Sequence, residues 1–211
     1  MTRFLIKTLV GFAILSSEIN AATVDNIRRV DFMNFSYPFN APTFVKALGR
    51  VVKVRGGKFD ERHVRTDMGF FYFRVADIIY GDLTGDGRDE AVVTTIYGSN
   101  SGTFYLTNVY VYTLKNGSPV LLDGITDERA GKIYKSYYPD EWSALYEGLE
   151  GGRRVGAGKL IVRHYADGSH CCSDKTATFE YKWNGRRMEL VRLLKREPSV
   201  RDEKMKAYYN R

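Results

Sequence analysis

The sequence is poor in cysteine and proline and lacks the usual enzyme signatures. Its 211 residues include two Cys and five Pro. Two cysteines cannot staple a disulfide-rich scaffold or supply a multi-cysteine zinc module, so the fold must be stabilised by a hydrophobic core. The chain has no G-x-S-x-G, S-x-x-K or H-E-x-x-H motif, no Walker loop and no dinucleotide fingerprint. No catalytic or cofactor-binding residue is therefore predicted. A non-catalytic role is preferred, and an enzyme whose site is assembled only by the fold stays open.

Long apolar runs are also missing, and the only notable one lies near the N-terminus. Basic residues precede an apolar run from Leu9 to Leu15, and Ile19 and Ala21 occupy positions −3 and −1 of a cleavage site. This order predicts a secretory signal peptide over residues 1–21. The run is far shorter than the roughly 20 residues that cross a bilayer, so we expect no transmembrane span in the mature protein. The predicted localisation is exported, periplasmic or extracellular.

The charge balance is basic, with 32 Lys and Arg against 25 Asp and Glu, for a net charge of +7. Export argues against a nucleic-acid partner. A basic surface attracts anionic headgroups, lipopolysaccharide phosphates or an acidic protein, and it serves solubility equally well. The partner is therefore expected to be an unknown protein or envelope component.

Aromatic residues are abundant, with 15 Tyr and 12 Phe, and they gather in runs typical of strands. The sequence predicts strands over these runs: Phe70 to Tyr80, Ala91 to Tyr97, Thr103 to Leu114, Val120 to Leu122, Leu160 to His164, Lys175 to Trp183 and Met188 to Leu194. Asn116-Gly117 predicts a hairpin between the strands Thr103 to Leu114 and Val120 to Leu122. Asn184-Gly185 predicts a second hairpin, between Lys175 to Trp183 and Met188 to Leu194. A short helix is expected over Asp140 to Tyr146, after Pro139, and the alternative is a long loop.

These elements predict a mainly β protein with a minor α+β character. We expect a single antiparallel twisted sheet or half-open barrel with a few short helices, in one β-rich domain over residues 22–197. A charged tail follows over residues 198–211. In the strand Lys175 to Trp183, alternation places Phe179 and Tyr181 inward and Glu180 outward.

The loop between the first two predicted strands, Asp82 to Glu90, carries the one credible ion site. Counted from Asp82, oxygen-bearing side chains occupy positions 1, 3, 5 and 9, and a glycine at position 6 permits a sharp turn. Calcium prefers six to eight such oxygen ligands. The predicted metal ligands are these: Asp82, Thr84, Asp86, the carbonyl of Arg88, and Glu90. Position 12 is Val93 rather than Glu, which excludes an EF-hand switch.

An alternative needs no metal. Asp82 and Asp86 can cap loop amides through Asx-turns, while Gly85 and Gly87 supply positive φ. If an ion is bound, the loop is expected to be structural, since it would fix the register of two neighbouring strands.

With its flanks, the segment Tyr80 to Val93 resembles the strand-loop-strand calcium sites of FG-GAP and VCBS-type repeats. The resemblance implies the same five ligands, but Thr84 replaces an Asp or Asn and Glu90 replaces an Asp. It occurs once, so it implies a shared site rather than a shared fold. More widely, the order of this loop, the hairpins and the adjacent cysteines is similar to a group of uncharacterised exported bacterial proteins. That resemblance implies export and a β fold, and no activity.

The two cysteines, Cys171 and Cys172, are adjacent and form a candidate disulfide or redox pair. A trans peptide places neighbouring Cα atoms 3.8 Å apart, below the usual range for a disulfide, so a bond between them would be strained. The alternatives are intermolecular or mixed disulfides, reduced thiols that bind a soft metal with His164 or His170, or inert thiols.

The sequence therefore predicts an exported, non-catalytic binding or interaction protein with a structural calcium-type loop. The alternative is an inhibitor or immunity protein that blocks an envelope-active hydrolase, using an aromatic stretch such as Tyr134 to Tyr146.

Overall fold

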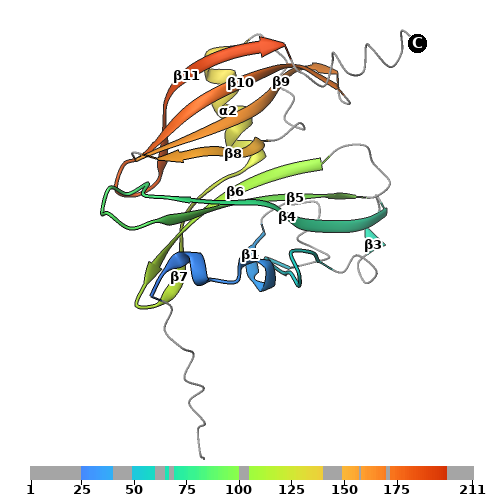
Figure 1. Cartoon of the computed structure of the whole chain (residues 1–211). Coiled ribbons are helices and arrows are strands. Elements are labelled where there is room, and N and C mark those ends of the chain that lie inside the picture. Colours follow the sequence, from blue (N-terminus) through green and yellow to red (C-terminus); the bar gives the residue numbers. More distant parts are fainter. Residues whose placement is uncertain are drawn as a thin grey trace, which may run out of the picture.

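The computed structural model describes residues 25–39, 49–59, 65–66, 69–99, 105–139, 149–156, 158–169 and 172–198, which form three layers (Figure 1). A five-stranded antiparallel sheet lies in the middle, in the order β3-β4-β5-β6-β7. Its strands are β3 (Arg65–Thr66), β4 (Gly69–Gly81), β5 (Glu90–Ser99), β6 (Tyr105–Lys115) and β7 (Ser118–Ile125).

The N-terminal layer packs on one face of this sheet. It contains two 3₁₀ turns and a small two-stranded sheet: η1 (Ile27–Arg29), η2 (Phe32–Asn34), β1 (Ser36–Pro38) and β2 (Val51–Lys53). The other face carries the third layer, a four-stranded antiparallel sheet in the order β11-β10-β9-β8 with one helix (Figure 1). Its elements are α2 (Asp127–Tyr137), β8 (Leu149–Gly156), β9 (Lys159–Ser169), β10 (Cys172–Trp183) and β11 (Met188–Pro198).

The prediction of a mainly β, antiparallel and open architecture is confirmed. All the predicted strands are present, and the described strands are divided between two principal sheets rather than joined in one. The hairpin at Asn116-Gly117 is a two-residue turn with φ of 52° and 72°, as this dipeptide favours. The hairpin at Asn184 is longer, because Trp183 pairs with Met188 and the Asn184 side chain accepts hydrogen bonds from the amides of Arg186 and Arg187.

The central sheet is covered on both faces, which explains the sequence of β5. Nine of its ten residues are buried. Ala91 and Val93 face the N-terminal layer, whereas Val92 faces the four-stranded sheet. A strand covered on both sides can be apolar on both faces, so Ala91, Val92 and Val93 follow one another without the polar alternation of a half-exposed strand.

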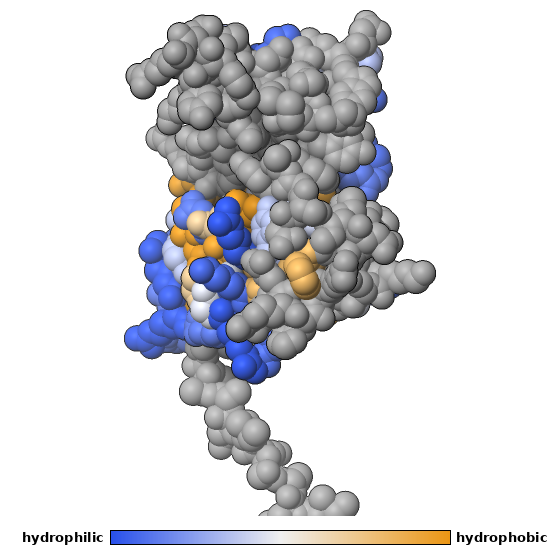
Figure 2. Space-filling model, turned by 90° about the vertical axis from the view of Figure 1, so that its right-hand side faces the viewer, coloured by the Kyte–Doolittle hydropathy of each residue, from blue (hydrophilic) through white to orange (hydrophobic). Residues whose placement is uncertain are grey.

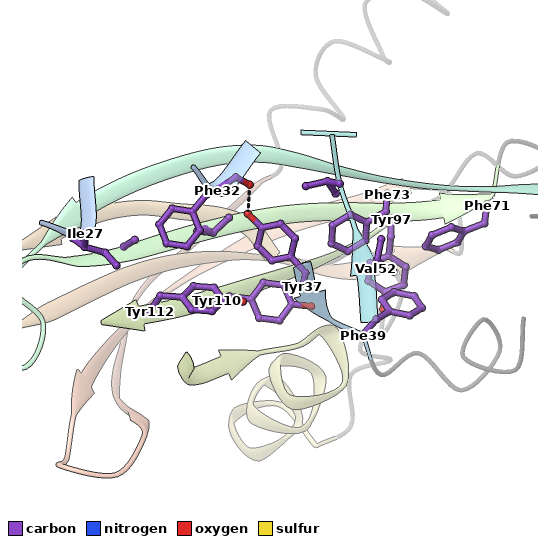
Figure 3. Close-up of a cluster of buried hydrophobic side chains, with 13 residues drawn as sticks. Ile27, Phe32, Tyr37, Phe39, Val52, Phe71, Phe73, Tyr97, Tyr110 and Tyr112 are labelled. Carbon is purple, nitrogen blue, oxygen red and sulfur yellow. Dashed lines mark hydrogen bonds between the residues drawn. The ribbon is translucent and has the colours of Figure 1, made fainter. Parts of the chain in front are cut away.

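The first core lies between the N-terminal layer and the central sheet, and it is built from aromatic rings (Figure 3). Phe39 packs edge-on against Phe71 and Tyr97 at centroid distances of 5.4 Å and 5.0 Å. The hydroxyl of buried Tyr37 donates a hydrogen bond of 2.6 Å to the carbonyl of Phe32 (Figure 3). The polar end of Tyr37 is thereby satisfied within an apolar layer.

The second core lies between the two principal sheets and is mostly aliphatic. Its fully buried members include Val92, Val109, Leu160, Val162 and Met188. The helix α2 joins this core, since Tyr137 packs on Phe179 at 5.7 Å.

Sequence reasoning did not predict α2. The signals were present: Thr126 is an N-cap whose hydroxyl accepts a hydrogen bond from the amide of Arg129. Ala130, Ile133 and Tyr134 repeat at helical spacing. The predicted helix over 140–146 lies outside the described residues, as do the predicted signal peptide and the tail beyond residue 198.

The outward face of β10 is less exposed than alternation suggests. Glu180 is 5% exposed, because Lys159 and Arg192 from the neighbouring strands cover it with ion pairs of 3.1 Å each. A hydrogen bond from Lys159, with support from Arg192, lowers the pKa of Glu180. Among the described residues, no helix is long and apolar enough to cross a membrane.

Candidate functional site: the Asp82–Glu90 loop and its cleft

The loop between β4 and β5 holds the two principal sheets together. Leu83 is 2% exposed and packs in the second core, so the loop inserts an apolar side chain between the sheets. The carbonyl of Asp82 accepts a 3.0 Å hydrogen bond from the amide of Gly158, in the turn between β8 and β9. At Gly81 a side chain would clash with Val155 of β8, because an added Cβ would lie 2.6 Å from its Cγ1. The loop therefore acts as a clasp from the central sheet to the four-stranded sheet.

Glu90 anchors this clasp from the start of β5, where it is completely buried. Its Oε2 accepts hydrogen bonds from the amides of Leu83 at 2.8 Å and Thr84 at 3.0 Å. Its Oε1 accepts from the hydroxyls of Thr113 at 3.1 Å and Thr84 at 3.4 Å. One carboxylate thus satisfies the backbone donors that position Leu83, which is the reason a charged group is tolerated there.

Burial raises the pKa of Glu90, and the hydrogen bonds from Leu83, Thr84 and Thr113 oppose that rise. The negative charge of Asp86 nearby adds a smaller upward contribution to the pKa. A raised pKa means that the folded protein holds the Glu90 proton more tightly than the unfolded chain does.

The remaining acidic side chains cap the loop backbone. Asp82 accepts from the amides of Gly85 at 2.6 Å and Gly87 at 3.0 Å, one to each carboxylate oxygen. Asp86 accepts from the amide of Arg88 at 2.9 Å. Gly85 and Gly87 have φ of 80° and 81°, in the region that favours glycine. These contacts are the Asx-type capping that the metal-free alternative predicts.

In this arrangement the acidic side chains of the loop are already engaged in hydrogen bonds. Both oxygens of Asp82 and both oxygens of Glu90 already accept hydrogen bonds from the chain. The described residues contain no group of three or more His, Cys, Asp or Glu side chains placed to hold a metal ion. Thr84 lies beside Glu90, and the Arg88 side chain is exposed. Calcium binding by this loop stays a prediction.

The N-terminal layer contacts the outer end of the loop. Arg28 of η1 donates from Nε to Asp89 at 2.7 Å, and its guanidinium lies 4.9 Å from the ring centroid of Tyr80. These contacts bring a segment near residue 28 against one near residue 89. Sequence reasoning missed Arg28, because nothing local indicates a partner 61 residues away.

A polar cleft lies where the N-terminal layer, the loop and the β6–β7 hairpin meet. Its volume is about 670 Å³. Asp25 and Ile27 line one side, Arg88 and Asp89 another, and Asn116 a third. Both signs of charge border it, so it suits a polar or zwitterionic group better than a purely apolar one.

A second clasp joins the sheets through α2. Arg129 of α2 donates to both carboxylate oxygens of Asp123 in β7, at 3.0 Å and 2.8 Å, and also to the carbonyl of Met188. Asp123 in turn accepts from the amide of Met188 at 2.7 Å. The pair is largely shielded from water, with side-chain exposures of 26% and 14%, so it fixes β7, α2 and β11 relative to one another.

The candidate cysteine site is only partly described. Cys172 begins β10, where it is the backbone partner of Ser169, and Cys171 lies outside the described residues. His164 is 3% exposed and its Nε2 lies 3.2 Å from the hydroxyl of Tyr181. Burial lowers the pKa of His164 to about 3. It is a neutral core residue that packs on Phe179.

No family model matches this chain, and no curated protein or solved structure is similar enough to count as a match.

Proposed function

We propose that the chain is an exported, non-catalytic binding or interaction protein whose ligand site is the cleft beside the Asp82–Glu90 loop. The supporting observation is that the acidic side chains of the loop are all engaged in hydrogen bonds. All four carboxylates, those of Asp82, Asp86, Asp89 and Glu90, accept at least one hydrogen bond from the chain. Groups committed to holding a loop are suited to shaping a surface rather than to transferring protons.

The cleft supports a binding role because three separate segments meet there. Each segment is rigidly connected: Arg28 bonds to the loop, the loop is clasped to the second core, and the hairpin at Asn116 is a tight turn. A preformed hollow of this kind costs a ligand little ordering energy. The partner remains an unknown protein or envelope component.

An affinity capture from envelope extract tests the binding role, with Arg88→Glu as the cleft variant. Arg88 is exposed and its side chain makes no hydrogen bond or ion pair that holds the fold, so the variant should fold normally. Arg186→Glu is the matched control, because Arg186 is exposed in the β10–β11 hairpin. We expect a stoichiometric partner with the wild type and the control and a loss with Arg88→Glu. Equal capture by all three proteins would contradict the cleft assignment.

Calcium is tested separately in the same preparation. An unchanged melting temperature on addition of calcium would show that the hydrogen-bonded loop does not take the ion. A concentration-dependent rise that Asp86→Ala abolishes would show instead that the loop takes the ion, since a ligand of the folded state stabilises by mass action. The binding role does not depend on this outcome.

The inhibitor alternative receives no support from a described contact. It needs an accessible aromatic loop, but Tyr134 lies in α2, is 3% exposed and packs on Tyr138 at 5.0 Å. Residues 140–148 lie outside the described residues.

A further inference from the structure

Three basic side chains form a row across neighbouring chain segments, on the side that faces away from the first core. Arg55 and Lys58 flank the Gly56-Gly57 turn and exchange backbone hydrogen bonds of 2.8 Å and 3.1 Å. Lys58 also pairs with Arg74 of β4. Residues directly opposite in such pairs project their side chains from the same face. The cationic row is thus Arg55, Lys58 and Arg74.

The pairing of Lys58 with Arg74 is the close type. The flanking hydrogen bonds, from Phe59 to Phe73 and from Val75 to Gly57, place Lys58 and Arg74 in a non-hydrogen-bonded pair. In that type the Cα atoms are about 4.5 Å apart and the side chains are nearest. Like charges opposite one another destabilise a sheet.

The charges of the row are not neutralised within the described chain. All three side chains are exposed, and none makes an ion pair or a side-chain hydrogen bond. Lys53 extends the row along β2, since Val52 and Val54 point into the core and Lys53 and Arg55 point outward. Some exposed cations of the described chain are paired, as at Arg28, Lys132 and Lys195. Others, such as Arg88, are unpaired but isolated, whereas the row places Lys58 directly opposite Arg74. Because unpaired cations that face each other cost stability, their presence indicates a surface that binds an external anion.

The same face carries exposed apolar side chains next to the cations. Val51 is 58% exposed and lies on the outward side of β2 with Lys53. Phe70 is 43% exposed and alternates with buried Phe71, so it lies on the same side of β4 as Arg74. Val51 precedes Arg55 by four residues, and Phe70 precedes Arg74 by four residues. Four residues of extended chain span about 13 Å. Figure 2 shows the side of the molecule on which β4 begins. The described residues on that side are largely hydrophilic and surround a small hydrophobic area.

We propose that this face docks on an anionic phospholipid bilayer. The cationic row would lie against lipid phosphates, and Val51 and Phe70 would enter the headgroup region beside them. Charge complementarity favours the bilayer because a membrane offers a continuous array of phosphates to a row of cations. The apolar residues favour it over a soluble polyanion, which has nothing to bind them. None of these residues lines the cleft, so the proposal is independent of the proposed function.

Vesicle sedimentation tests the proposal. The assay uses the exported form of the chain after removal of the predicted signal peptide, because residues 1–21 are themselves basic and apolar. We expect binding to vesicles of phosphatidylcholine with 30% phosphatidylglycerol, little binding to phosphatidylcholine alone, and weakening in 0.5 M NaCl. Binding to inorganic polyphosphate without binding to either vesicle would overturn the membrane assignment.

Lys58→Glu separates binding from folding. The substitution puts a carboxylate opposite Arg74, so it should raise the melting temperature while it weakens vesicle binding about thirty-fold. That factor follows from two charge units at about 1 kcal/mol each, with tenfold for every 1.4 kcal/mol. Higher stability with unchanged binding would overturn the proposal.

Arg186→Glu supplies the matched control, because it makes the same change in net charge on the β10–β11 hairpin. We expect its effect on vesicle binding to be less than fivefold. A loss equal to that of Lys58→Glu would show that only the net charge matters, and it would also overturn the proposal. Val51→Asn should reduce the binding that remains in 0.5 M NaCl, since the apolar contact is not screened by salt. If that residual binding is unchanged, insertion of the apolar residues is refuted.

Discussion

The two cores of this protein bury titratable groups of different kinds. The first core, under the N-terminal layer, includes the buried tyrosines Tyr37, Tyr110 and Tyr112 among its titratable members. Burial raises the pKa of Tyr110 to about 12 and raises those of the other two as well. Such phenols stay neutral in both folded and unfolded chains below about pH 10, so the first core is indifferent to acid.

The second core packs against groups that titrate in acid. His164 lies against Phe179 and Tyr181, and Glu90 lies under the loop that inserts Leu83. From this difference we expect the sheet-to-sheet interface, rather than the aromatic layer, to make the fold sensitive to pH and to loop substitutions. Each of the following changes acts on one core and spares the other.

The largest effect is expected for Phe73→Ala in the first core. Phe73 is 1% exposed and contacts the rings of Tyr37 and Phe39 at 5.7 Å and 6.1 Å. Removal of a buried ring costs about 3–5 kcal/mol of the free energy of unfolding. Urea denaturation measures the loss, which should be the same at pH 7 and pH 5. Phe70→Ala is the control on the same strand, and a loss above about 1.5 kcal/mol there would contradict the assignment of Phe70 as exposed.

Leu83→Ala should cost about 3 kcal/mol, because it empties a buried leucine position between the sheets. Arg88→Ala, five residues later in the same loop, should change the free energy of unfolding by less than about 0.5 kcal/mol. Similar small effects for both variants would show that the loop is not a clasp.

Glu90→Ala should cost about 2–3 kcal/mol, since it leaves the amides of Leu83 and Thr84 buried without an acceptor. Glu90→Gln keeps one acceptor oxygen and should cost less than about 1 kcal/mol. The raised pKa adds a pH signature: ionisation of Glu90 costs the folded state stability as pH rises through its pKa. The free energy of unfolding of the Gln variant, relative to wild type, should therefore increase between pH 4 and pH 7. A constant difference would contradict a raised pKa of Glu90.

Acid should weaken the second core through His164. Its pKa is about 3 in the folded protein and about 6.5 in the unfolded chain, so below pH 6.5 the unfolded chain binds the proton that the folded protein excludes. Stability should fall by about 1.4 kcal/mol for each pH unit in that window, or about 2 kcal/mol at pH 5. His164→Gln should remove this contribution. A wild-type stability that is flat from pH 7 to pH 5 would refute it.

Much of the fold could be predicted from sequence, because strand and turn signals are local. The alternation of Leu106, Tyr110 and Tyr112 places them on one face, and all three contact the first core. The glycine spacing of the Asp82–Glu90 loop correctly indicates a tight turn with capped amides. The sequence does not distinguish a metal site from a hydrogen-bonded turn, because both use the same residues at the same positions.

The sequence by itself determined seven of the strands, the two Asn-Gly hairpins and the antiparallel class, since these depend on a two-residue period and on turns a few residues long, but it did not predict β1, β2, β3 or β8. The tertiary structure alone decided that the strands divide into two sheets, that Glu90 holds the amide of Leu83 inside the interface, and that Arg129 bonds to β11. It also set Lys58 opposite Arg74. The physical reason is that such pairs join residues far apart in the chain, and their geometry depends on how separate layers pack rather than on local propensity.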